Sequence, residues 1–117
     1  MREVIAQRMI SLAKSIVSGD VAKTILEQMG GMNRIRAMTG AYNFLDGGDS
    51  VSFLFPNRKR SRGNSVMVTY DRGSDTYTME FFNVSIKGAK KVKSVSGVYA
   101  DQLISIFSKQ TGLDLKL

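Results

Sequence analysis

Hydrophobic positions in the first part of the chain recur at helical spacing. Ile5, Met9, Leu12 and Ile16 lie three or four residues apart, and polar residues separate them. This periodicity predicts an amphipathic helix over residues 3–18.

A second helix is predicted over residues 20–29. Asp20 is suited to the N-cap position, and Ile25 and Met29 fall on one inward face. The pair Gly30-Gly31 marks its end because glycine is common just beyond a helix C-terminus. The sequence therefore predicts a helical N-terminal pair within residues 1–31.

From Asn33 the hydrophobic period changes to two. Residues 33–39 alternate and predict a first strand, followed by an irregular glycine-containing stretch over 40–49. Three further strands have alternating apolar faces: Val51, Phe53 and Phe55; Val66, Val68 and Tyr70; Tyr77, Met79 and Phe81. A weaker fifth strand is predicted over residues 91–95, so residues 33–95 form an antiparallel β-meander.

Helical spacing returns near Gly97. Tyr99, Leu103 and Phe107 define one stripe of a helix over residues 97–111, and Gly112 is suited to end it. We therefore expect one α+β domain over residues 1–117. It has an antiparallel sheet of four to five strands, with two N-terminal helices and one C-terminal helix (97–112) packed on one face.

The composition argues against most familiar hydrolytic chemistry. The 117 residues contain no His and no Cys, which removes the usual general base, thiolate nucleophiles and the commonest zinc ligands. Asp46 and Asp49 flank a glycine pair, but the spacing of further oxygen ligands for calcium is missing, which favours an ordinary turn. We expect no enzyme, no catalytic residue, no metal and no cofactor.

The segment 1–18 also bears on location. Glu3, Arg8 and Lys14 interrupt its apolar positions, so it resembles neither a signal peptide nor a membrane span. We expect a cytoplasmic protein without a membrane partner.

Charge is concentrated in the middle of the chain. The net charge is +7, of which +6 lies in residues 51–96, because this segment contains nine basic and three acidic residues. Successive turns of a meander alternate between the two ends of the sheet. The turns after the second and fourth predicted strands should therefore meet at one end, opposite the turn that contains Asp71 and Asp75.

This arrangement predicts a nucleic-acid interface, because clustered basic side chains most often bind phosphate backbones. The predicted phosphate-binding residues are Arg58, Lys59, Arg60, Arg62, Lys87, Lys90, Lys91 and Lys93. The alternative is that these residues only keep hairpin tips soluble and block edge pairing.

Two aromatic residues are candidates for base stacking. The strand alternation leaves Tyr42 and Phe82 away from the predicted core, where bases of a single strand can stack on them. Packing within the core or at a sheet edge is the alternative. The candidates lead us to expect a single strand rather than a duplex.

Several stretches resemble a group of small uncharacterised proteins of bacteriophages, prophages and mobile elements. They are, in order, I-L-E-Q-M-G-G, A-M-T-G-A-Y-N-F, S-F-L-F, D-T-Y-T-M-E-F and G-V-Y-A-D-Q-L-I-S-I-F-S-K-Q-T-G-L, and they cover roughly residues 24–115. The resemblance implies expression in a bacterial host cell but assigns no active site. It also suggests an alternative function, in which a phage-encoded module binds or inhibits a host protein. Residues 3–18 lie outside the resemblance, and their narrow apolar stripe makes them a candidate helix for homodimerisation or docking.

Overall fold

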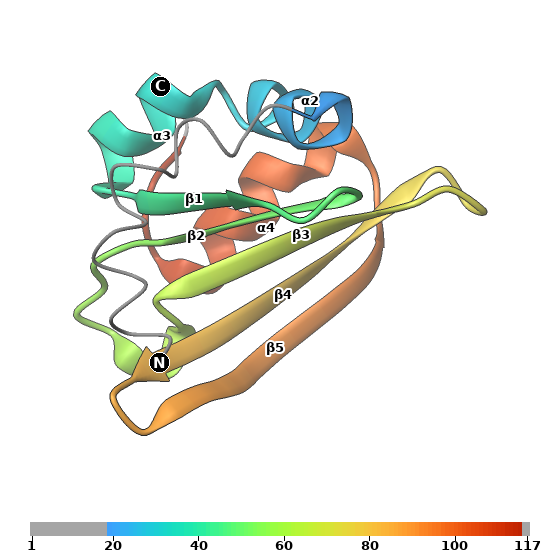
Figure 1. Cartoon of the computed structure of the whole chain (residues 1–117). Coiled ribbons are helices and arrows are strands. Elements are labelled where there is room, and N and C mark those ends of the chain that lie inside the picture. Colours follow the sequence, from blue (N-terminus) through green and yellow to red (C-terminus); the bar gives the residue numbers. More distant parts are fainter. Residues whose placement is uncertain (1–18, 116–117) are drawn as a thin grey trace.

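The structure of the protein is a computed structural model, in which residues 19–115 are described. Its centre is a five-stranded antiparallel sheet with the strand order β1-β2-β3-β4-β5, so each strand pairs with its neighbour in sequence (Figure 1). Helix α4 lies behind the strands in this view, and α2 and α3 lie above β1. The α+β class and the antiparallel meander predicted from the sequence are confirmed.

The shortest strands lie at the β1 edge of the sheet and the longest at the β5 edge. Their bounds are Tyr42–Asp46 for β1, Ser50–Leu54 for β2, Ser65–Asp71 for β3, Thr76–Ser85 for β4 and Gly88–Val98 for β5. The helical elements are α2 (Asp20–Gln28), α3 (Met32–Thr39), the 3-10 turn η1 (Arg60–Arg62), the 3-10 turn η2 (Ala100–Gln102) and α4 (Leu103–Thr111).

Helix α2 confirms the second predicted helix with small changes at its ends. The N-cap is Gly19, and Asp20 is the first helical residue instead of the cap. The predicted helix over residues 3–18 lies outside the described residues.

The predicted first strand over residues 33–39 is wrong, because these residues form α3. Ile35 and Thr39 are buried one helical turn apart, and the Thr39 hydroxyl donates a hydrogen bond to the Ile35 carbonyl at 2.6 Å. Ala37, which completed the apparent alternation, is exposed. The two buried positions fit both a period of two and a helical turn, and tertiary packing selects the helix.

Three other boundaries differ from the sequence-based expectation. The stretch predicted to be irregular contains β1, and β5 extends well beyond residues 91–95 on both sides. The C-terminal helix begins at Leu103 instead of residue 97, because Gly97 and Val98 still belong to β5 and η2 intervenes. Gly112 ends α4 in the left-handed conformation (φ 80°), as predicted.

Phenylalanine rings fill the core between the sheet and α4. Phe107 of α4 lies 5.2 Å from Phe55, 6.1 Å from Phe53 and 6.3 Å from Phe81, measured between ring centroids. Phe44 of β1 continues the cluster at 5.0 Å from Phe53. These rings are buried, so one helical side chain joins strands β2 and β4.

We expect Phe107→Ala to lower the free energy of unfolding by about 3–5 kcal/mol, because it removes buried apolar contacts and leaves a cavity. Urea denaturation followed by circular dichroism measures this change. The control is Lys109→Ala, an exposed position on the same helix, which should change the free energy by about 0.5 kcal/mol or less. Equal effects of the two substitutions would contradict this account of the core.

Candidate nucleic-acid interface

The basic turn between β2 and β3, residues 57–63, is held by hydrogen bonds from Asn57. Its side-chain nitrogen donates to the Gly63 carbonyl at 2.8 Å and to the Thr111 carbonyl at 3.2 Å. Its side-chain oxygen accepts from the Lys59 amide at 3.1 Å. Asn57 therefore closes the turn and connects it to the C-terminal end of α4.

Asn64 attaches the far end of this turn to β4. Its side chain accepts a hydrogen bond from the Val84 amide at 2.7 Å and donates to the Val84 carbonyl at 3.0 Å. Its backbone amide donates to the Phe82 carbonyl, and its carbonyl accepts from the Phe55 amide. The Asn64 side chain thus forms hydrogen bonds with both the amide and the carbonyl of Val84, as a residue of a neighbouring strand would.

Gly63 is required by the close approach of the turn to the sheet. Its φ of +98° favours glycine, and an added Cβ would lie 3.2 Å from the Phe82 carbonyl oxygen. The same Cβ would lie 3.4 Å from side-chain atoms of Phe81 and Val92. A side chain here would therefore require a small shift of the basic turn or of β4.

This packing brings the two predicted basic loops together. Arg60 of η1 lines one shallow hollow with Lys87 and Lys90, which come from the turn and strand after β4. The hollow has a volume of about 440 Å³. Its remaining lining residues are Asn83, Ser85, Gly88 and Ala89. The prediction that these turns lie at one end of the sheet is confirmed for Arg60, Lys87 and Lys90.

A second hollow lies where the basic turn meets the end of α4. It has a volume of about 560 Å³, and its lining residues are Pro56, Asn57, Arg58, Lys59, Thr111, Gly112 and Leu113. Arg58 and Lys59 are exposed at its rim, so these two cations are also available at the same end of the molecule.

Three of the predicted residues have surroundings that the sequence did not reveal. Arg62 donates from Nη1 to the Lys109 carbonyl at 3.3 Å, where a cation stabilises the negative end of the α4 dipole. Lys91 forms an ion pair with Glu80 at 2.7 Å. Lys93 is exposed on β5 but is not among the residues that line the hollow. The cations that line the two hollows therefore form one set, which we call the basic end: Arg60, Lys87, Lys90, Arg58 and Lys59.

The candidate stacking residues share a row of the sheet but do not meet. The register pairs Tyr42 with Leu54, Leu54 with Ser65, and Ser65 with Phe82, so β2 and β3 separate the two rings. Tyr42 is 46% exposed, whereas Phe82 is half-buried. Tyr42 is the more accessible ring, and base stacking on either one stays a prediction.

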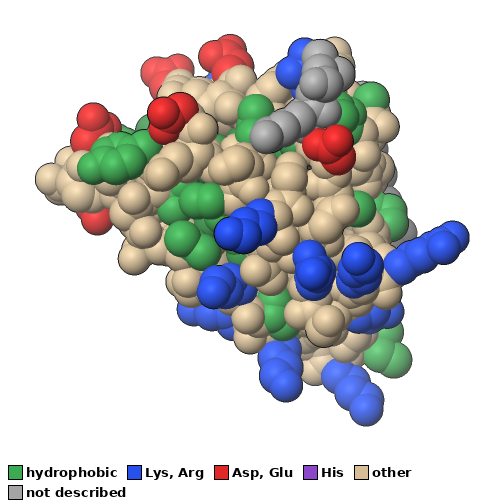
Figure 2. Space-filling model, turned by 180° about the vertical axis from the view of Figure 1, so that it is seen from behind, with side chains coloured by type: hydrophobic (Ala, Val, Ile, Leu, Met, Phe, Trp, Pro, Cys, Tyr) green, Lys and Arg blue, Asp and Glu red, His purple; other side chains and the backbone are tan. Residues whose placement is uncertain are grey.

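Figure 2 shows the resulting separation of charge. Lys and Arg side chains gather over the lower half of this face, whereas Asp and Glu side chains lie mainly along the upper and left edges.

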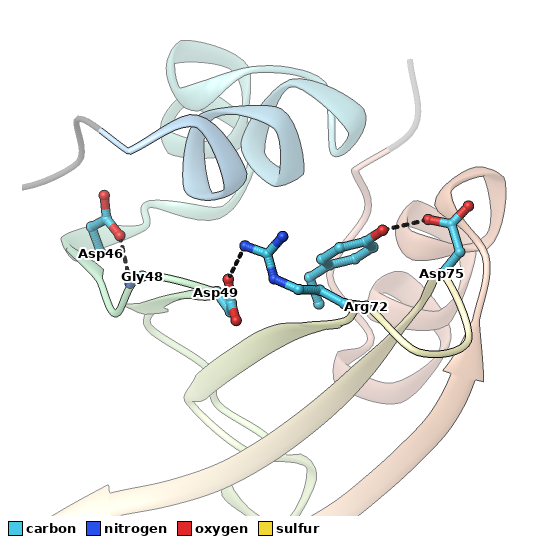
Figure 3. A network of polar contacts seen from close by, with 6 residues as sticks. Asp46, Gly48, Asp49, Arg72 and Asp75 are labelled. Carbon is cyan, nitrogen blue, oxygen red and sulfur yellow. Dashed lines mark hydrogen bonds and ion pairs between the residues drawn. The ribbon is translucent and has the colours of Figure 1, made fainter.

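The acidic side chains at the other end of the sheet have local partners (Figure 3). Arg72 pairs with Asp49 at 2.9 Å, and the Tyr70 hydroxyl donates to Asp75 at 2.7 Å. Asp46 accepts hydrogen bonds from the amides of Gly48 and Gly19. The turn with Asp46 and Asp49 is thus organised by hydrogen bonds and an ion pair within the protein.

Sequence reasoning missed the residues that position the basic end. The run of basic residues is flanked by Asn57, Gly63 and Asn64. Because asparagine and glycine are common at turns, these residues could have been recognised from the sequence as turn-forming. Their specific partners, Thr111, Phe82 and Val84, are distant in sequence and follow only from the packed structure.

Comparisons of the chain with protein-family models, curated proteins and solved structures found no match. The resemblance to phage and mobile-element proteins stays a prediction. Within residues 19–115, no helix is long and apolar enough to span a membrane, and no three potential metal-ligating side chains form a cluster.

Gly63 and Gly31 provide a matched test of the close approach of the basic turn to β4. Their backbones are nearly identical (φ 98°, ψ 150° and φ 96°, ψ 148°), but an added Cβ at Gly31 meets nothing within 4 Å. We expect Gly63→Ala to lower the free energy of unfolding by roughly 1–3 kcal/mol more than Gly31→Ala, because only Gly63→Ala adds overpacking to backbone strain. Urea denaturation of both variants measures the difference, and equal losses would show that the turn tolerates a side chain.

The Tyr70–Asp75 contact predicts a pH response at the acidic end. The hydrogen bond to Asp75 raises the pKa of Tyr70 above its ordinary value of 10.0, with burial and the Asp75 charge adding to the shift. A raised folded-state pKa means that the contact stabilises the protein below pH 10 and loses this effect as the pH rises through the folded-state pKa. Ultraviolet titration should show one tyrosine with a lower pKa in Asp75→Ala. An unchanged titration curve would argue against the contact.

Proposed function

We propose that this protein binds nucleic acid through phosphate contacts at the basic end. The single observation that carries the proposal is the hollow where Arg60 lies beside Lys87 and Lys90, three cations from two separate loops. Placing three like charges together is unfavourable unless an anion or solvent screens them. A polyanion that spans both loops supplies such screening.

The shape and chemistry of the basic end support a phosphate chain over a small anion. The hollow is shallow, and Arg58 and Lys59 extend the positive surface toward the second hollow at the end of α4. Arginine forms paired hydrogen bonds with phosphate oxygens, and lysine adds mobile charge. An extended backbone can therefore contact several of these side chains in succession.

The rigidity of the turn also supports binding. Asn57 and Asn64 hold the turn between them, and the Gln110 side chain donates to the Arg62 carbonyl at 3.3 Å. A backbone that is already ordered loses less conformational entropy when a ligand binds. We expect sequence-independent affinity on the order of 10⁻⁴ to 10⁻⁶ M at physiological salt, as is typical of phosphate contacts alone.

Salt-dependent oligonucleotide titrations test the proposal. The triple variant Arg60→Ala, Lys87→Ala, Lys90→Ala should reduce the slope of log affinity against log salt by about two to three, near one unit for each lost phosphate contact. The control Lys23→Ala, Arg34→Ala, Arg72→Ala removes the same charge away from the hollow and should leave most of the slope.

Two results would contradict the proposal. One is the absence of binding by the wild-type protein at low salt. The other is an equal loss of slope in both triple variants, which would indicate that net charge matters and the basic end does not. In the first case the alternative, a phage-encoded module that binds a host protein, gains support, since an apolar protein interface depends little on salt.

A further inference from the structure

Ile86 is the one large hydrophobic residue in the described part of the chain that is fully exposed. Its side chain is 100% accessible, compared with 59% for Tyr99 and 46% for Tyr42. It occupies the two-residue turn with Lys87 between Ser85 and Gly88, which pair as the last residue of β4 and the first residue of β5. Such turns favour Gly, Asn and Asp, so a β-branched apolar residue here has no local conformational advantage.

The hairpin holds this side chain in a defined place. The pairs Asn83–Lys90, Val84–Ala89 and Ser85–Gly88 continue to the tip, and the Ser85 hydroxyl accepts from the Lys87 amide at 3.2 Å. Asn64 pairs with Val84, only two residues from Ile86. Ile86 thus projects from an ordered support instead of a long loop.

The tip adjoins the cationic hollow. Ser85 and Lys87, the neighbours of Ile86 on both sides, line the hollow together with Arg60 and Lys90. A nucleic acid whose phosphates lie in the hollow would bring its sugars and bases near the tip. Proteins that kink or unstack nucleic acids insert single apolar side chains between base steps at such places.

We propose that Ile86 inserts between neighbouring bases of the nucleic acid held at the basic end, an inference that rests on the proposed function. The stiff χ1 torsion of isoleucine limits the entropy lost on insertion. The tip fits a base step better than a lipid surface, because membrane binding scales with the apolar area buried and one residue supplies little. Insertion turns an exposed apolar side chain into the group that separates the bases.

The fluorescence of 2-aminopurine, which rises when the base loses its stacking neighbours, provides the test. Single-stranded and duplex oligonucleotides that carry this base are titrated with wild-type protein, Ile86→Ser and Ile86→Leu. We expect a rise with the wild-type protein on at least one of the two nucleic acids. Ile86→Ser should lose most of this rise at saturation, and Ile86→Leu should keep it. The salt slope of Ile86→Ser should equal that of the wild type, because all cations remain.

The outcomes separate this inference from the proposed function. If the wild-type protein binds with a steep salt slope but Ile86→Ser gives the same rise, or no protein gives a rise, the insertion is wrong and phosphate binding stands. If the wild-type protein does not bind at low salt, both are wrong. Phosphatidylserine vesicles form a further arm: loss of vesicle binding in Ile86→Ser, with unchanged oligonucleotide fluorescence, would overturn the inference in favour of a lipid surface.

Discussion

The pair of hydrogen bonds between the Asn64 side chain and the Val84 backbone determines where the basic end lies. It ties the connection between β2 and β3 to Val84 of β4, a residue twenty positions later in the chain. Gly63 allows the same segment to approach the Phe82 carbonyl, which would lie 3.2 Å from the Cβ of any larger residue. Together these contacts place η1 beside the β4–β5 hairpin, so Arg60 shares a hollow with Lys87.

The same turn depends on α4. Asn57 donates to the carbonyl of Thr111, and Arg62 donates to the carbonyl of Lys109, so two carbonyls near the helix C-terminus receive donors from the basic turn. Phe107 packs this helix against the sheet. The hydrophobic core therefore positions the charged surface indirectly. The phenylalanine rings fix the position of α4 on the sheet, and the end of α4 supports the basic turn that carries the cations.

The strands were predictable wherever one face is buried and alternation is regular, as in Val51, Phe53 and Phe55. Helix α3 was missed because Ile35 and Thr39 satisfy two periods at once, and the choice between them depends on packing. Strand β1 was missed because it is short and irregular: its register shifts between Tyr42 and Leu45. Alternating periodicity is weak evidence in such segments.

The gathering of basic loops could be predicted because it follows from meander topology alone. The individual surroundings of the cations could not. Arg62 interacts with a residue 47 positions later in the chain, and Lys91 pairs with Glu80 across β4 and β5. Such partners depend on register and on helix position, which composition and spacing do not specify.

Mapping of backbone amide chemical shifts during oligonucleotide titration tests the central claim most directly, because it locates the contact surface without a mutation. The account predicts shifts concentrated in residues 57–64 and 85–91, fading as salt is added, with little change in the acidic turn at residues 71–75. Shifts centred on that acidic turn or on α2, or no shifts at low salt, would contradict it.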